Sequence, residues 1–139
     1  MSAAVPSRGR ATGTGIIGVG IDLCSVERMA AALQRTPGLA PRVFTGAEMA
    51  ALDLLDDGDL ARAAAELFAI KEAVMKALGR GFGSIPFDGI EVERDGVTVR
   101  LLGAALQRAE SLGVRSLSVE SELLAGTAAP TVLASVVAS

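Results

Sequence analysis

The chain of 139 residues contains no histidine, a single cysteine and very few aromatic side chains, with four Phe and neither Trp nor Tyr. The absence of histidine excludes Ser–His–Asp and Cys–His nucleophilic sites, histidine proton shuttles and histidine-rich zinc sites. One cysteine, Cys24, permits no internal disulfide, which is typical of a reducing compartment, so we expect a cytoplasmic protein. Acid–base chemistry then falls to Asp, Glu or Lys, and any bound metal must have oxygen ligands.

Charge and size exclude further classes of protein. Thirteen Lys and Arg against 16 Asp and Glu give a net charge of −3, which attracts neither nucleic acid nor an anionic membrane. The scarcity of aromatic residues also removes the stacking platforms used on single-stranded nucleic acid. No apolar run approaches the roughly 18 residues of a membrane span, and the first 14 residues lack the apolar core of a secretory signal. We expect a flexible tail over 1–14 and one domain over 15–139.

Hydrophobic periodicity and turn signals predict an α+β domain. Alternating apolar residues predict a first strand over 17–23, and the Asp95-Gly96 turn predicts a hairpin. The expected helices span 25–35, 45–55, 60–78 and 103–112, and the later strands span 90–92, 97–101, 114–120 and 131–138. Residues 56–59 are interpreted as a solvated break between two helices. This order predicts a mainly antiparallel sheet packed on helices.

Asp22 is the first candidate for chemistry. It ends the first predicted strand on the face otherwise occupied by Gly18 and Gly20, where backbone or ligand can approach closely. A carboxylate beside bare glycines suits a hard cation. An equally good interpretation is that Asp22 caps the helix that starts near Ser25.

The long predicted helix carries two lysines and a glutamate in informative places. Lys71 falls inside the apolar arc of the helix, while Glu72 and Lys76 lie along its flank, four residues apart. The simpler interpretation is that Lys71 extends its ammonium to solvent and that Glu72 and Lys76 form an exposed pair. Taken alone, the helix favours this simpler interpretation, whose weakness is the charge of Lys71 at a place where packing favours an aliphatic side chain.

A glycine-rich segment follows this helix. Gly79, Gly81 and Gly83 surround Arg80 in a loop whose backbone N–H groups can cradle a phosphate. The negative end of the helix repels anions unless a cation offsets it, and Lys76 and Arg80 are placed to do so. The alternative is that Gly79 ends the helix and the other glycines are turn residues.

Taken together, three segments resemble the holo-acyl-carrier-protein synthase group of 4′-phosphopantetheinyl transferases. They are Gly18-Val19-Gly20-Ile21-Asp22, the stretch Phe68-Ala69-Ile70-Lys71-Glu72-Ala73-Val74-Met75-Lys76-Ala77-Leu78-Gly79-Arg80-Gly81, and Phe87-Asp88-Gly89-Ile90-Glu91-Val92. Each piece is weak alone, and the combination is specific. The resemblance implies Mg²⁺-dependent transfer of 4′-phosphopantetheine from coenzyme A to a serine of an apo acyl carrier protein, in fatty-acid or polyketide biosynthesis. The alternative is a non-catalytic or repurposed homologue that binds a carrier protein or coenzyme A.

The resemblance also implies roles for individual residues. Asp22 and Glu72 match the two magnesium-binding carboxylates, and with Lys76 they form the catalytic set. The residues expected at coenzyme A are Lys71, Lys76, Gly79, Arg80, Gly81 and Gly83.

The partner implied by the resemblance is an acidic carrier protein, which predicts a basic surface on this chain. Arg28 and Arg35 lie seven residues apart on one helix face, and Arg42 follows. Scattered, solvated arginines are the alternative interpretation. The family's small α+β domain is a homotrimer with active sites between neighbouring subunits, so a homotrimer is expected here.

The sequence departs from the family pattern at four places. Leu67 stands where Arg is usual, Ser25 replaces an acidic residue, and the plain Asp95-Gly96 turn replaces Gly-Lys-Pro. The family's Ser/Thr-His pair near the carboxyl end has no counterpart in residues 117–122. All but the change at Ser25 are expected to loosen contacts to the nucleotide of coenzyme A.

Overall fold

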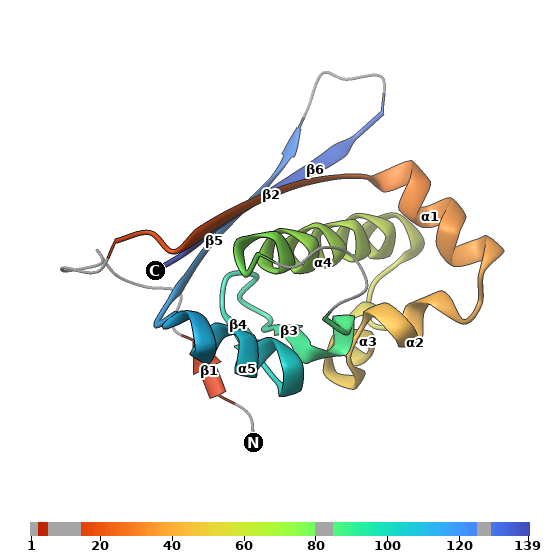
Figure 1. Cartoon of the computed structure of the whole chain (residues 1–139). Coiled ribbons are helices and arrows are strands. Elements are labelled where there is room, and N and C mark those ends of the chain that lie inside the picture. The colour runs from red at the N-terminus through yellow and green to blue at the C-terminus, as the bar shows by residue number, and fades with distance from the viewer. Residues whose placement is uncertain (1–2, 6–14, 80–84, 125–128) are drawn as a thin grey trace.

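A 21-residue helix, α4 (Asp57–Ala77), forms the centre of the computed structural model and connects two small sheets (Figure 1). The structure describes residues 3–5, 15–79, 85–124 and 129–139. The other helices are α1 (Val26–Arg35), α2 (Leu39–Val43), α3 (Gly46–Leu52), the 3₁₀ turn η1 (Phe87–Gly89) and α5 (Gly103–Leu112). The strands are β1 (Ala3–Val5), β2 (Gly18–Ser25), β3 (Ile90–Val92), β4 (Val99–Leu101), β5 (Leu117–Leu124) and β6 (Thr131–Ala138).

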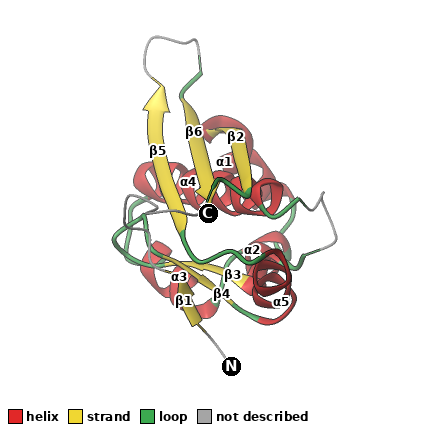
Figure 2. Ribbon diagram, turned by 60° about the vertical axis from the view of Figure 1, so that its left-hand side comes forward, coloured by secondary structure: helices red, strands yellow, loops and turns green. Residues whose placement is uncertain are grey.

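Both sheets are three-stranded and antiparallel, with the orders β2-β6-β5 and β1-β4-β3. Helix α4 lies across one face of the first sheet, as the two ribbon views show (Figures 1 and 2). Along β6 buried residues alternate with partly exposed ones, because every second side chain points toward α4. The facing side of α4 is rich in small residues, and Ala69, Ala73 and Ala77 are buried there. The core therefore sits between α4 and the sheet that contains β2.

Three local signals in the sequence act as predicted at the ends of helices. The Ser25 hydroxyl accepts a hydrogen bond from the Arg28 N–H at the start of α1. Thr45 and Glu48 form a complete capping box at the start of α3. Helix α5 ends at Gly113, whose φ of 75° favours glycine. The predicted α+β class, with antiparallel sheet packed on helices, is confirmed.

Four details of the predicted architecture are corrected. The expected break over residues 56–59 is instead the start of α4: Asp56 caps it by accepting from the Asp59 N–H. Acidic side chains suit this position because they complement the positive helix N-terminus. Helix α3 ends at Leu52 rather than Leu55, and the short helix α2 was not expected. The strands form two sheets rather than one.

The amino-terminal segment also differs from the expectation of a flexible tail. Ala3–Val5 forms β1, which pairs with β4. The remaining residues of that segment lie outside the described part. Across the described residues, none of the helices combines the length and the apolar character that a membrane crossing requires.

Candidate functional site

The site is positioned by a direct contact between the backbones of β2 and α4. A Cβ atom built on Gly20 would lie 1.9 Å from the Ala73 carbonyl oxygen, and one on Gly18 would lie 2.0 Å from that of Ala77. No side chain fits in either place. These two glycines were expected to leave room for a ligand or for backbone, and the structure shows that helix backbone fills that room. Their function is to bring the strand against α4 and hence Asp22 against the helix.

Asp22 of β2 forms an ion pair with Lys76 of α4, next to the place where the strand and the helix touch. The Lys76 Nζ atom donates to the Asp22 Oδ1 atom at 3.0 Å and to the Ile21 carbonyl oxygen at 2.9 Å. The Asp22 side chain is 16% exposed and that of Lys76 is 49% exposed, so the pair opens to solvent on the lysine side. The alternative role of Asp22 as a helix cap is not observed, because Ser25 caps α1.

Glu72 lies one helical turn before Lys76 and faces the same region. Partial burial raises the pKa of its carboxyl group, and the negative charge of Asp22 raises it further, against an opposing effect of Lys76. The effect of Asp22 on the pKa of Glu72 indicates that two residues 50 positions apart in the sequence lie near each other in the fold. The three residues predicted as catalytic are therefore brought together. Such a centre can bind a cation through its carboxylates and an anion through its lysine.

Lys71 requires a correction, because its side chain is fully buried and points away from this centre. Its Nζ atom lies 2.5 Å from the Glu48 Oε1 atom and donates to the carbonyl oxygens of Val43 at 2.7 Å and Phe87 at 3.2 Å. It neither reaches solvent nor exposes an atom to coenzyme A. The sequence identified an unusual lysine correctly, and the structure shows that its partner is a buried carboxylate.

Glu48 completes this buried polar cluster. Its carboxylate accepts from the Thr45 N–H at 2.9 Å and from the Val92 N–H at 2.8 Å, in addition to Lys71. The pair thus connects α4 to α2, α3, η1 and β3. Sequence analysis identified Glu48 only as a capping residue, because nothing local indicates a lysine 23 positions away.

The glycine-rich segment is described only at its first residue. Gly79 has a φ of 71° and ends α4, as the capping interpretation expected. Arg80, Gly81 and Gly83 lie outside the described residues. Arg108 of α5, which the sequence did not single out, donates its Nε–H to the Leu78 carbonyl oxygen at 2.9 Å.

Arg28, Arg35 and Arg42 are all exposed, on α1 and on the last turn of α2. Among the residues that the structure describes, none of the three forms an ion pair. Their charges therefore face solvent and are available to a partner.

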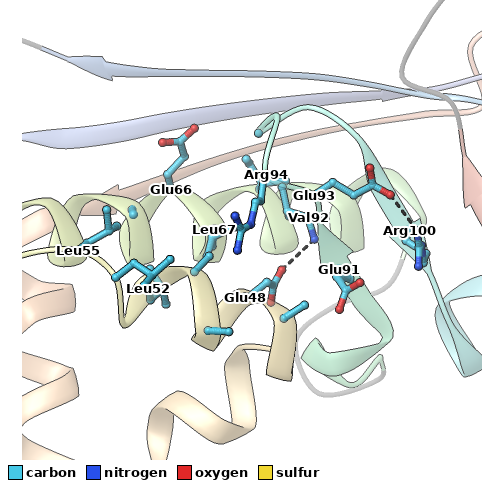
Figure 3. Close-up of a pocket in the computed structure, with 17 residues that line it drawn as sticks. Glu48, Leu52, Leu55, Glu66, Leu67, Glu91, Val92, Glu93, Arg94 and Arg100 are labelled. Atoms are coloured by element: carbon cyan, nitrogen blue, oxygen red, sulfur yellow. Dashed lines mark hydrogen bonds and ion pairs between the residues drawn. The ribbon is translucent and has the colours of Figure 1, made fainter.

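A pocket of about 820 Å³ lies elsewhere, between α3, α4 and the β3–β4 hairpin (Figure 3). Its lining includes Leu52, Leu55 and Leu67, and its rim carries the Glu93–Arg100 ion pair. Asp22, Glu72 and Lys76 do not line it. Leu67 gives this pocket an apolar wall at the position where the resemblance led us to expect arginine.

Comparisons with known proteins agree on one family. Residues 18–128 match the sequence profile of the 4′-phosphopantetheinyl transferase superfamily. The chain is 44% identical over 124 residues to a holo-[acyl-carrier-protein] synthase of Streptomyces griseus, a match that covers 86% of this chain and 98% of that protein. A second such synthase, from Cutibacterium acnes, is 41% identical over 115 residues, which cover 81% of this chain and 92% of that one.

Solved structures give the same result. An acyl carrier protein synthase of Plasmodium yoelii with ADP bound superposes with a TM-score of 0.78 at 26% identity, covering 89% of this chain and 95% of that one. A holo-[acyl-carrier-protein] synthase of Helicobacter pylori in complex with coenzyme A superposes with a TM-score of 0.69 at 26% identity, covering 87% and 99%.

Proposed function

The chain belongs to the 4′-phosphopantetheinyl transferase superfamily, and we propose that Asp22, Glu72 and Lys76 form the centre of its activity as a holo-[acyl-carrier-protein] synthase. This enzyme transfers phosphopantetheine from coenzyme A to an apo acyl carrier protein. The observation that supports the proposal most strongly is the contact of Lys76 with Asp22, at the place where Glu72 also lies. This ion pair joins Asp22 of β2 to Lys76 of α4 on a surface that is partly open to solvent.

The donor set fits magnesium. Asp22 and Glu72 offer carboxylate oxygens, and no group of three or more His, Cys, Asp or Glu among the described residues forms a complete protein cage for a metal. Mg²⁺ is commonly held by one or two carboxylates together with substrate phosphates and water. When bound there, the ion supplies positive charge that offsets the charge of the diphosphate. The residues that would hold it are Asp22 and Glu72.

Lys76 and Glu72 have separate roles in the transfer. The Lys76 ammonium, half exposed, binds the diphosphate of coenzyme A. The Glu72 carboxylate accepts the proton of the carrier serine. The serine oxygen then bonds to the phosphorus of the pantetheine arm. The bond from that phosphorus to the bridging oxygen breaks, and adenosine 3′,5′-bisphosphate leaves with both electrons of the bond.

The carrier protein binds to the basic surface formed by Arg28, Arg35 and Arg42. All three arginines are exposed and lack an ion pair within the described chain, which leaves their charge for an acidic partner. Neutralising charges on this surface is expected to slow association with the carrier more than the chemical step.

Exposed apolar side chains on the outer face of β2 support the proposal that the chain forms a homotrimer. Val19, Ile21 and Leu23 are 58%, 60% and 59% exposed, and they form an apolar stripe on an edge strand. Single exposed apolar residues are common, but a contiguous stripe of this kind is typical of an interface. The occupant proposed is another copy of the chain. Light scattering is then expected to give about three times the 14.1 kDa monomer mass.

The decisive experiment measures transfer with apo carrier proteins, Mg²⁺ and coenzyme A, using mass spectrometry of the carrier. Asp22→Asn, Glu72→Gln and Lys76→Met are each expected to slow transfer by about a hundredfold or more, a typical effect of removing an acid–base or charge-stabilising group. Glu110→Gln on the exposed side of α5 is the matched control and should keep the rate within about twofold.

Two outcomes would contradict the proposal. If the wild-type chain modifies no carrier but binds carriers equally well with and without Glu72, it is a non-catalytic binding module. If transfer occurs and the three variants retain it, the active centre lies elsewhere on the molecule.

A further inference from the structure

Arg108 reaches from α5 to the C-terminal end of α4, next to the beginning of the glycine-rich segment. Figure 1 shows α5 below that end of the long helix. The Arg108 Nε–H donates to the Leu78 carbonyl oxygen at 2.9 Å. Its Nη2 atom lies 3.3 Å from the position that a Cβ on Gly79 would occupy. The guanidinium therefore lies close against Gly79.

The negative end of α4 does not fully neutralise the positive charge of Arg108. The C-terminal end of a helix carries about half a negative charge, whereas the guanidinium carries a full positive one. Within the described residues the ion pairs involve Lys71, Lys76 and Arg100, and Arg108 has no carboxylate partner. Arg108 is also only partly exposed. A net positive charge thus remains at the end of α4.

The remaining donors of Arg108 suit a phosphate. A guanidinium has five N–H donors in a planar fork, of which the bond to Leu78 uses one. The terminal nitrogens can therefore bind two oxygens of one phosphate. Lys76 lies two residues before Leu78, about 3 Å along the helix axis and about 200° around it, and its ammonium contacts β2, whereas Arg108 comes from α5. The two cations therefore suit an extended ligand with separate phosphate groups.

We propose that Arg108 binds a phosphate group of coenzyme A at the C-terminal end of α4. This inference rests on the proposed function, and it adds a substrate contact from an element that carries none of the three proposed catalytic residues. Coenzyme A has two candidate groups, the diphosphate and the 3′-phosphate. Both have the same chemistry, and dephospho-coenzyme A, which lacks the 3′-phosphate, distinguishes them.

The test compares Arg108→Met and Arg108→Lys with the wild-type enzyme. In Arg108→Met, the KM for coenzyme A is expected to rise about tenfold or more, as for the loss of a charge-assisted hydrogen bond, with kcat and the KM for the carrier within about twofold. Affinity for coenzyme A should also depend less steeply on salt. Arg108→Lys should regain part of the affinity. If dephospho-coenzyme A abolishes the difference between variant and wild type, the 3′-phosphate is bound; if the difference persists, the diphosphate is.

The control is Arg62→Met, which removes an exposed arginine from the N-terminal half of α4 and should leave the KM unchanged. A KM for coenzyme A within about twofold of wild type in Arg108→Met would overturn the inference. So would a matched loss of kcat and thermal stability with unchanged salt dependence, because that pattern indicates a structural cap. Calorimetry that compares the affinity of coenzyme A for the wild-type protein and for Arg108→Met tests the inference without measuring turnover. A failure of the proposed function therefore remains distinguishable from a failure at Arg108.

Discussion

Breaking the buried pair of Lys71 and Glu48 is predicted to destabilise the fold strongly, although neither residue belongs to the proposed catalytic centre. Both side chains are almost completely inaccessible, at 0% and 1% exposure. Replacing Glu48 by Gln leaves a buried ammonium without its counter-charge, and replacing Lys71 by Met leaves a buried carboxylate without its cation. Breaking a buried pair in this way typically costs about 3–5 kcal/mol. Small domains are stable by only about 5–15 kcal/mol, so either variant removes a large part of the total.

The double variant separates the interaction from the cost of burial. Once Lys71→Met has removed the cation, Glu48→Gln no longer leaves a buried charge unpaired. The double variant should therefore be destabilised by about 1 kcal/mol or more less than the sum of the two single variants. The surface pair Glu93–Arg100, with side chains 38% and 39% exposed, is the control. Glu93→Gln should change stability by less than about 1 kcal/mol.

Urea unfolding followed by far-ultraviolet circular dichroism measures these differences, because a chain without Trp or Tyr offers little intrinsic fluorescence. Measurements at several protein concentrations separate folding from subunit association. If Lys71→Met and Glu48→Gln each cost no more than the surface control, the buried pair is not a stabilising contact. Strict additivity would show that the two side chains do not interact.

Two further predictions concern β2. Gly20→Ala places a methyl group against the Ala73 carbonyl and should lower the free energy of unfolding by about 4 kcal/mol or more, whereas Gly38→Ala, with open space around it, should change it by less than about 1 kcal/mol. Equal effects in urea unfolding would refute the close contact. Burial, with a smaller effect of Asp22, raises the pKa of the Cys24 thiol to about 11. Its alkylation rate in the folded protein should therefore keep rising about tenfold per pH unit from about pH 8 to 10. In unfolded chain it should level off near about pH 8.5, and a similar plateau in folded protein would contradict the shift.

What the sequence predicted well depends on contacts within a few residues. Ser25 and the Thr45–Glu48 box determine helix starts through side chains that bond to backbone three positions away. Gly113 ends α5 through its own backbone conformation. The acidic segment at 56–59 was misinterpreted because Asp and Gly are frequent both in loops and at helix starts. Only the continuation of the helix beyond it decides between them.

What the sequence missed depends on contacts between distant segments. The Arg108–Leu78 bond spans 30 positions, and the Lys71 contact with Val43 spans 28. Periodicity marked Lys71 as unusual, but it could not tell a buried partner from a bound substrate. The pairing of β1 with β4 joins segments almost a hundred residues apart, and a three-residue strand carries too little pattern to be recognised. Asp22 and Glu72 were associated through family resemblance, since nothing local connects them.

The direction in which α4 presents Glu72 and Lys76 depends on contacts on two sides of the helix. Successive side chains differ by about 100° around a helix, so a rotation by one residue would turn Glu72 and Lys76 away from Asp22. On one side, Gly18 and Gly20 of β2 lie directly against the backbone of Ala77 and Ala73, so the strand packs closely on the helix at these positions. On the other, Lys71 is fixed by a carboxylate and two carbonyl oxygens from three other elements. The residue next to the proposed base thus serves the site by fixing the rotation of α4. Transfer by Lys71→Met should decline with the folded fraction, whereas transfer by Lys76→Met should be lost in a fully folded protein.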